Sequence, residues 1–269
     1  MTHEPATSTP IAAADQMLFR VEQVTKQFQG EHGPVTALAP ASFDVREGEF
    51  VSLVGPSGCG KTTMLRLCAG LLQPTSGEVS YRGTGQPIQP GTYGIVFQQP
   101  ALLDWRTVAD NLLLPAQILG LDLVAARKRI AGLLDQVHLA DAADQLPAQL
   151  SGGMQQRAAI ARALVHDPDV LFMDEPFGAL DAFTRERLND DLADLHQAVG
   201  KTVLFVTHDI DEAVYLSDRV LVLASRPGRL VDVRTVDLGR PRDRESAAFR
   251  DEVKAIRKLL DGPTARTST

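Results

Sequence analysis

An α/β fold built on a mainly parallel sheet is predicted by three features of the 269-residue sequence. Strand-like apolar runs alternate with helical segments through its second half, as is typical of parallel strands covered by helices. A glycine-rich loop near residue 55 separates a short apolar run from a segment compatible with a helix. Residues 100–165 carry mostly helical patterns within this alternation. We therefore expect a sheet core with a helical insert.

The first 100 residues predict a short tail followed by strands. Residues 1–16 are rich in Thr, Ala and Pro, and we expect a disordered tail there. Beyond this tail the chain runs without a linker or an internal repeat. Turn-rich residues 29–34 and 73–77 separate the first elements. In order, the predicted elements are strands at 18–28, 35–45 and 50–54, a helix from Lys61, and strands at 78–82 and 93–97.

Helix signals dominate the next segment. Thr107 and Asp110 have the spacing of a capping box before an apolar stretch, which predicts a helix start. Apolar residues at i, i+3, i+4 and i+7 predict an amphipathic helix, and another helix should follow Ser151; the four apolar residues are Ile130, Leu133, Leu134 and Val137. Strands at 170–173, 203–206 and 220–223 then alternate with helices at 184–198 and 210–216, and a last helix at 246–260 should pack on the body.

Composition limits the classes of partner. The chain is 44% hydrophobic and 23% charged, and its formal net charge is −7, so no nucleic acid partner is expected. Cys59 and Cys68 lack metal-ligand spacing and are interpreted as reduced thiols of a cytoplasmic protein. No apolar run approaches the roughly 18 residues that span a bilayer, and the N-terminus lacks the order of a signal peptide. A membrane role would therefore need a membrane-embedded partner.

The stretch GPSGCGKT, residues 55–62, has the form G-x-x-x-x-G-K-T between a predicted strand and a predicted helix. In such a loop backbone N–H groups surround an anion, Lys61 reaches the β- and γ-phosphates, and the Thr62 hydroxyl can ligate Mg²⁺. The alternative is a chance glycine loop. We predict a nucleoside-triphosphate site whose binding residues are Gly55, Pro56, Ser57, Gly58, Cys59, Gly60, Lys61, Thr62 and Thr63.

Polar residues at the ends of three other strands complete the predicted chemistry. Asp174 follows four apolar residues and can hold Mg²⁺, while the neighbouring Glu175 can polarise an attacking water. His208 and Gln98 also follow strands, where ligands bind in α/β sheets. His208 can bear on the γ-phosphate, and Gln98 can reach Mg²⁺ or the water. The alternatives are solvated acids at a strand end and structural His and Gln side chains.

A second glycine-containing helix start follows at Ser151-Gly152-Gly153, without a lysine to finish a phosphate loop. A serine N-cap and two glycines leave backbone N–H groups open to an anion. One nucleotide does not need two such places in one chain. A second copy of the chain would explain the motif if this helix end faced the nucleotide of its partner, whereas the alternative is a plain helix cap.

The octapeptide LSGGMQQR, residues 150–157, resembles the signature motif of ATP-binding cassette (ABC) ATPases, and it lies between Walker A and Walker B motifs as in that family. The resemblance extends over about residues 18–223. It implies a P-loop NTPase fold with an N-terminal antiparallel β subdomain and a helical insert. It also implies head-to-tail dimers in which each nucleotide lies between the Walker A motif of one cassette and the signature helix of the other.

The resemblance assigns further roles. Gln98 matches the Q-loop glutamine, residues 179–181 with Asp181 match the D-loop, and His208 matches the switch histidine. Phe28 stands where the family stacks an aromatic on adenine, although a core aromatic is the alternative. Catalytic roles are implied for Glu175, His208, Lys61 and Gln98, metal binding for Thr62, Gln98 and Asp174, and binding to the opposite nucleotide for Ser151, Gly152, Gly153 and Gln155.

Three segments, 102–108, 174–181 and 225–229, resemble the ATPase subunits of nitrate, sulfonate and taurine importers. Relatives of that group also serve bicarbonate or thiamine-precursor uptake. Trp105 lies in the insert that such proteins press against a membrane partner, and its alternative is an ordinary packed aromatic. The sequence does not identify the solute.

The combined interpretation is an ATP-hydrolysing importer subunit that uses ATP and Mg²⁺ and lies on the cytoplasmic face of a bacterial inner membrane. Its expected partners are a second ATPase subunit, membrane permease subunits and, indirectly, an extracytoplasmic solute-binding protein. The expected organisation is an ATPase domain at 17–240 and a C-terminal helix and tail at 241–269 in the same domain. The alternatives are a DNA-repair or ribosome-associated ABC ATPase, an ABC exporter, and a P-loop kinase or GTPase.

Overall fold

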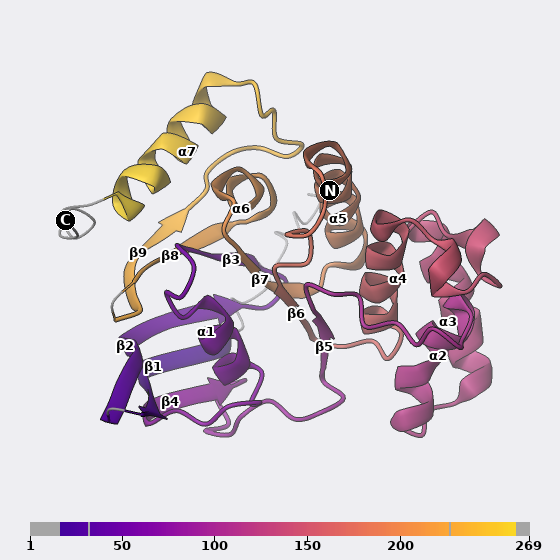
Figure 1. Ribbon diagram of the computed structural model, residues 1–269, viewed down its shortest axis with the longest axis horizontal. Coiled ribbons are helices and arrows are strands. Elements are labelled where there is room, and N and C mark those ends of the chain that lie inside the picture. Colours follow the sequence, from indigo (N-terminus) through magenta and orange to yellow (C-terminus); the bar gives the residue numbers. More distant parts are fainter. Residues whose placement is uncertain (1–16, 32, 226, 262–269) are drawn as a thin grey trace, which may run out of the picture.

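The computed structural model describes residues 17–31, 33–225 and 227–261, which form two sheets with most of the helices above and beside the larger one (Figure 1). The predicted tail at 1–16, the C-terminal end of the predicted 241–269 segment, and Arg226 within the 225–229 motif lie outside the described residues. Within the described ranges, every helix is too short or too polar to span a bilayer.

The large sheet has six strands, and all its neighbours run parallel except the last pair. Its central strands are mostly apolar and almost entirely buried because helices or the second sheet cover both faces. The strand order is β5 (Tyr93–Val96), β6 (Val170–Asp174), β7 (Thr202–Thr207), β3 (Phe50–Val54), β8 (Arg219–Ala224) and β9 (Arg229–Thr235). The predicted mainly parallel core is confirmed.

The small sheet contains the N-terminal hairpin. Strand β1 (Met17–Gly30) pairs antiparallel with β2 (Gly33–Arg46) on one side and β4 (Ser76–Tyr81) on the other. Helix α1 (Lys61–Cys68) lies between the two sheets (Figure 1), and its buried residues share one apolar core with both. This confirms the antiparallel N-terminal subdomain, and the shared core fixes the orientation of α1 and of the loop before it.

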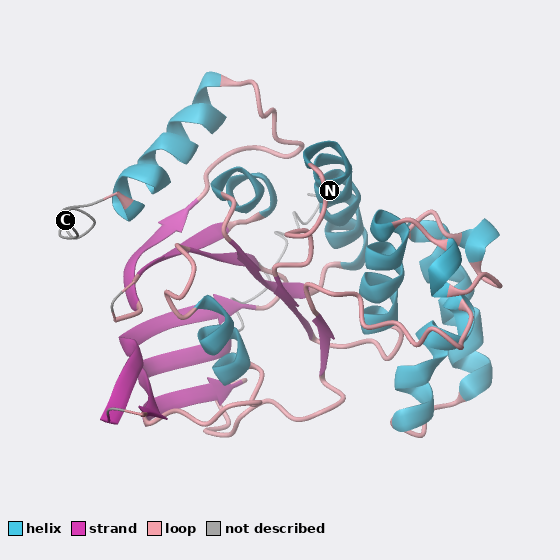
Figure 2. Cartoon of the chain, viewed as in Figure 1, coloured by secondary structure: helices cyan, strands magenta, loops and turns pink. Residues whose placement is uncertain are grey.

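Helices gather beyond the β5 edge of the large sheet (Figure 2). Thr107 accepts a hydrogen bond from the Asp110 amide at 3.2 Å, so the predicted helix cap is confirmed. Ile130, Leu133, Leu134 and Val137 are all buried, as their spacing indicates. The elements are α2 (Val108–Ile118), α3 (Leu123–Gln136), two short 3₁₀ turns (Ala140–Ala142 and Pro147–Gln149) and α4 (Gly152–Leu164).

The remaining helices are α5 (Ala182–Val199), α6 (Ile210–Leu216) and α7 (Ala247–Leu260). Helix α7 buries Phe249, Val253 and Ile256 in one cluster with α6 and β8, as expected for packing against the body. Strand β9 was not predicted from the sequence. Its side chains are mostly half-buried or exposed because it lies at the sheet edge, so it lacks the apolar run that marks the central strands.

The topology determines where functional groups meet. Strands β6, β7 and β3 are adjacent and parallel, so the segments that follow their carboxyl ends emerge at one edge of the sheet. Those segments are the phosphate loop after β3, Asp174 and Glu175 at the end of β6, and His208 after β7.

Candidate active site

The loop between β3 and α1 has the backbone of a phosphate loop. Gly58 and Gly60 have φ angles of +77° and +93°, which side chains with a Cβ rarely adopt. Gly60 is the N-cap of α1, so the first amides of the helix point toward the loop. A Cβ on Gly58 would meet no atom within 4 Å, so this part of the loop faces open space. The loop is thus shaped for close approach by an anion.

Backbone atoms of β8 and of the turn after it pack against the phosphate loop. A Cβ on Gly55 would lie 2.3 Å from the Leu223 carbonyl oxygen, and one on Gly228 would lie 2.3 Å from the Cys59 carbonyl oxygen. The Gly228 carbonyl oxygen also accepts a hydrogen bond from the Ala39 amide at 2.6 Å. The turn between β8 and β9 therefore packs directly on the phosphate loop. Sequence reasoning assigned no role to Gly228.

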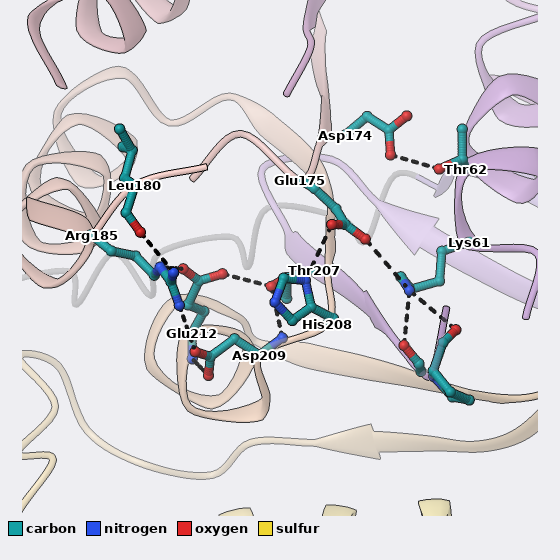
Figure 3. Close-up of polar contacts among 12 residues, drawn as sticks. Lys61, Thr62, Asp174, Glu175, Leu180, Arg185, Thr207, His208, Asp209 and Glu212 are labelled. Atoms are coloured by element: carbon teal, nitrogen blue, oxygen red, sulfur yellow. Dashed lines mark hydrogen bonds and ion pairs between the residues drawn. The ribbon is translucent and has the colours of Figure 1, made fainter. Parts of the chain in front are cut away.

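Lys61 lies inside the loop and is only 5% exposed. Its Nζ donates a hydrogen bond to the Gly55 carbonyl oxygen at 2.8 Å and lies 3.6 Å from Oε1 of Glu175 (Figure 3). A buried ammonium needs such partners because desolvation is costly. The structure thus brings the predicted phosphate-binding cation next to the predicted base.

Thr62 and Asp174 are also brought together. The Thr62 hydroxyl donates to Oδ1 of Asp174 at 2.8 Å (Figure 3). Burial raises the pKa of the Asp174 carboxyl, and the Thr62 hydroxyl and nearby Arg66 oppose that rise. A hydroxyl and a carboxylate are hard oxygen donors of the kind that Mg²⁺ prefers. Among the described residues no cluster of three or more His, Cys, Asp or Glu could hold a metal.

Glu175 stands at the centre of the site. Its φ is +47°, in the left-handed region, and its amide donates to the Val206 carbonyl oxygen on β7 at 2.9 Å. Oε2 lies 3.1 Å from Nδ1 of His208, while Oε1 faces Lys61 (Figure 3). One carboxylate therefore lies between an ammonium and an imidazole, an arrangement suited to accepting a proton from water near a phosphate.

Gln98 follows β5 and approaches the same carboxylate. A Cβ built on Gly178 would lie 3.3 Å from Nε2 of Gln98 and 3.5 Å from Oε2 of Glu175. The Gln98 amide and the Glu175 carboxylate therefore both lie beside Gly178. No hydrogen bond among the described residues joins Gln98 to Thr62 or Asp174, so its predicted metal role stays a prediction.

The signature motif, residues 150–157, lies at the start of α4, apart from the phosphate loop. Ser151 caps α4 by accepting a hydrogen bond from the Met154 amide at 3.3 Å. Gln155 donates to the Pro147 carbonyl oxygen at 2.9 Å. A Cβ on Gly152 would lie 3.3 Å from Leu180, and one on Gly153 would lie 3.0 Å from Thr184, so both glycines allow close packing on the start of α5. Among the described residues no hydrogen bond or ion pair joins this helix start to the phosphate loop.

Three other predicted residues lie at the surface. Phe28 is 44% exposed, with the Lys26 ammonium 5.2 Å from its ring centre, so it is not a core aromatic. Asp181 caps α5 by accepting from the Thr184 amide at 3.0 Å. Trp105 is 75% exposed, so it is not an ordinary packed aromatic either. Adenine stacking and partner contact stay predictions for Phe28 and Trp105.

Sequence reasoning missed the groups that hold the His208 segment. Arg185, Asp209 and Glu212 form a polar cluster beside it (Figure 3). Asp209 accepts hydrogen bonds from the amides of Asp211 and Glu212 as the N-cap of α6. An Asp directly before a helical segment is a recognisable capping signal. No sequence pattern indicated that Arg185 would reach this segment.

Comparison with known proteins agrees with this geometry. The family model described as ABC transporter matches residues 38–178. The chain is 46% identical over 241 residues to an uncharacterised ABC transporter ATP-binding protein of Methanocaldococcus jannaschii, covering 90% of each chain. It is 44% identical over 263 residues to an aliphatic sulfonates import ATP-binding protein of Burkholderia lata, covering 97% of this chain and 91% of the relative.

A solved structure resembles the fold. The dimeric post-hydrolysis state of an ATP-binding cassette, bound to ADP and Pi, matches with a TM-score of 0.68 and 33% sequence identity. The match covers 82% of this chain and all of the cassette. The resemblance therefore includes a protein captured with the products of ATP hydrolysis.

Proposed function

Because this chain belongs to the ABC transporter family and is an ATPase of that family, we propose that it is the ATP-hydrolysing subunit of an importer for a small solute. The observation that carries the transport role is the similarity to a sulfonate import protein along 97% of the chain. The solute class that this relative favours is a sulfonate, and nitrate, taurine or a related compound fits the same group of importers.

Hydrolysis of ATP to ADP and phosphate is assigned to groups at one edge of the large sheet. The loop amides and Lys61 hold the phosphates, and Glu175 takes the proton of the attacking water. His208 holds the Glu175 carboxylate by its Nδ1 contact of 3.1 Å and reaches toward the γ-phosphate. Little covalent chemistry is needed, so positioning and charge stabilisation supply the rate.

Thr62 and Asp174 would hold Mg²⁺, with Gln98 as a further ligand or as a contact to the water. When bound, the ion would neutralise negative charge on the β- and γ-phosphates. The proposal for this ion is supported by the 2.8 Å separation of two hard oxygen donors beside the phosphate loop.

We further propose that two copies pair head to tail. The start of α4 with Ser151 and Gly152 is exposed, and in the described residues no hydrogen bond or ion pair joins it to this chain's own phosphate loop. A second copy would bring the start of its α4, with Gly153 and Gln155, to the nucleotide held by Lys61. The dimeric cassette bound to ADP and Pi supports this arrangement.

The proposed membrane partner is a pair of permease subunits, which places this chain on the cytoplasmic face of the inner membrane. Exposed apolar side chains close in sequence on the helical insert support that contact, since apolar side chains that gather on a surface mark interaction sites; these are Trp105, Ile118, Leu121 and Val124. A solute-binding protein would act on the opposite side of the membrane. The alternatives of a repair, ribosomal or export ATPase have no supporting observation.

Reconstitution tests the import role. The chain is placed with candidate permease subunits in proteoliposomes that enclose ATP, with a candidate solute-binding protein outside. We expect uptake of labelled alkanesulfonate, taurine or nitrate that stops when enclosed ATP is replaced by ADP. ATP-dependent release of solute from the vesicles would instead identify an exporter, and nucleotide hydrolysis without any flux would contradict transport.

A further inference from the structure

Arg185 lies on the first turns of α5, and its side chain connects two segments that the catalytic mechanism uses. Nη2 donates a hydrogen bond to the Leu180 carbonyl oxygen at 2.8 Å, and Nη1 lies 3.5 Å from Oδ2 of Asp209 (Figure 3). Leu180 belongs to the D-loop segment, and Asp209 directly follows His208. A single planar guanidinium therefore spans from the D-loop to the His208 segment.

The backbone on each side of His208 is fixed by the same cluster. The Thr207 hydroxyl donates to Oε2 of Glu212 at 2.6 Å and accepts from the Asp209 amide at 3.0 Å. Asp209 uses its other carboxylate oxygen to cap α6. With its two neighbours held in this way, His208 keeps its imidazole against Glu175, 3.1 Å from the carboxylate.

On the side of the cluster that faces Glu212, Arg185 makes only a long contact. Nε of Arg185 and Oε1 of Glu212 are both buried without a hydrogen-bond partner, and they lie 3.8 Å apart. The nearby Asn189 also has a buried side-chain oxygen without a partner. Because the Arg185–Glu212 contact exceeds hydrogen-bond distance, the hydrogen bonds on the Glu212 side do not fix the position of the arginine. The Leu180 and Asp209 contacts of Arg185 therefore carry the connection.

The D-loop end of this connection leads to the signature helix of the same chain. Gly152 packs on Leu180, and Gly153 packs on Thr184, one residue before Arg185. A displacement of the α4 start would therefore reach the carbonyl that Arg185 holds. The contacts run from the signature glycines through Leu180 and Arg185 to the segment that carries His208.

We propose that Arg185 is a positioning residue that links the signature helix of one subunit to the catalytic His208–Glu175 pair of that same subunit. This inference rests on the proposed dimer, in which the signature helix contacts the nucleotide of the other subunit. Through Arg185, engagement of that distant nucleotide sets the orientation of His208 at the subunit's own nucleotide. The residue thereby connects the two sites of the dimer.

The test is a double-mutant cycle of Arg185→Ala and His208→Ala, measured by single-turnover ATP hydrolysis at saturating ATP. We expect Arg185→Ala to lower the rate about 10- to 100-fold while ATP affinity stays within about twofold, because misplacement costs rate rather than binding. In the His208→Ala background the second substitution should have almost no further effect. Additive losses would show that Arg185 does not act through His208 and would overturn the proposal.

Two further variants separate positioning from folding. Arg187→Ala on the exposed face of the same helix should hydrolyse ATP at the wild-type rate. Arg185→Lys keeps the charge but cannot reach both Leu180 and Asp209. Its thermal stability should therefore equal that of the wild type, while its rate of ATP hydrolysis stays as low as that of Arg185→Ala. If Arg185→Lys instead had both the thermal stability and the hydrolysis rate of the wild type, Arg185 would have a structural role alone. Wild-type rates in Arg185→Ala would overturn this inference and leave the proposed importer function standing.

Discussion

The phosphate loop and the signature helix start both contain glycines and are both proposed to bind phosphate groups, but they differ in how much of the chain surrounds them. The loop is held by backbone from β8, the β8–β9 turn and β2, and its lysine already contacts Gly55 and Glu175. The start of α4 is exposed at Ser151 and Gly152, while its two glycines pack on Leu180 and Thr184. The phosphate loop is thus formed within the subunit, whereas the start of α4 presents its groups outward, as expected if it acts in the dimer proposed above.

The largest expected effect comes from the site that the subunit forms by itself. Glu175→Gln preserves shape but removes the proton acceptor, so hydrolysis should fall by about 10³-fold while ATP binding is retained. Binding measured by calorimetry, phosphate release and gel filtration with ATP should together show a trapped dimer. Near-normal turnover would remove Glu175 from the role of base.

Ser151→Ala tests the outward-facing site. Loss of this hydroxyl should lower hydrolysis by about 10- to 100-fold, because a donor to the partner's nucleotide is removed, while ATP affinity of the dilute monomer is unchanged. The matched control is Ser246→Ala, which removes an equivalent N-cap on α7, where Ser246 accepts from the Phe249 amide at 3.2 Å. Equal activity losses in both variants would mean that only helix capping matters.

Dilution distinguishes the two sites without mutation. If the signature start of a second copy is required, specific activity should fall roughly in proportion to protein concentration once the dimer dissociates. ATP binding per subunit should be unaffected, because the phosphate loop is complete within one chain. Full specific activity in a preparation shown to be monomeric by light scattering would contradict the dimer.

The smallest expected effect is on thermal stability, and it comes from Glu212 in the polar cluster with Arg185 and Asp209. Burial raises the pKa of Glu212 above its ordinary value of 4.5, so the folded state favours the protonated carboxyl. The stability that this preference contributes is complete below pH 4.5 and is lost as pH rises through the raised pKa. Glu212→Gln should therefore gain about 2–4 °C in melting temperature relative to wild type as the pH rises to neutrality. Thermal melts across pH 5 to 8 would show a constant difference if Glu212 has no such role.

The sequence predicted the central elements well because their patterns are local. The apolar runs of β3, β6 and β7 and the cap at Thr107 depend on a few neighbouring residues, and the structure places them as expected. The sequence placed Lys61 and Glu175 at the ends of two strands, β3 and β6, and the structure brings their side chains together across the end of β7, which lies between those strands. These features need only periodicity and the rule that parallel strands end at one edge.

Features that depend on distant contacts could not be predicted. Strand β9 is recognisable only by its pairing with β8 at the sheet edge. The reach of Arg185 from α5 to Asp209 and Leu180 depends on how α5 and α6 pack, and no residue spacing encodes it. The surface exposure of Phe28 and Trp105 likewise became clear only from the assembled fold.

The packing of Gly228 on the phosphate loop has a consequence for engineering. A methyl group at this position would overlap both the Cys59 and the Ala37 carbonyl oxygens, at 2.3 and 2.5 Å. The eight-residue motif at 55–62 would therefore not keep its shape in every strand–helix junction into which it was transplanted. A transplant into another scaffold would have to include the β8–β9 turn, although some 165 residues of chain separate the two segments in the sequence.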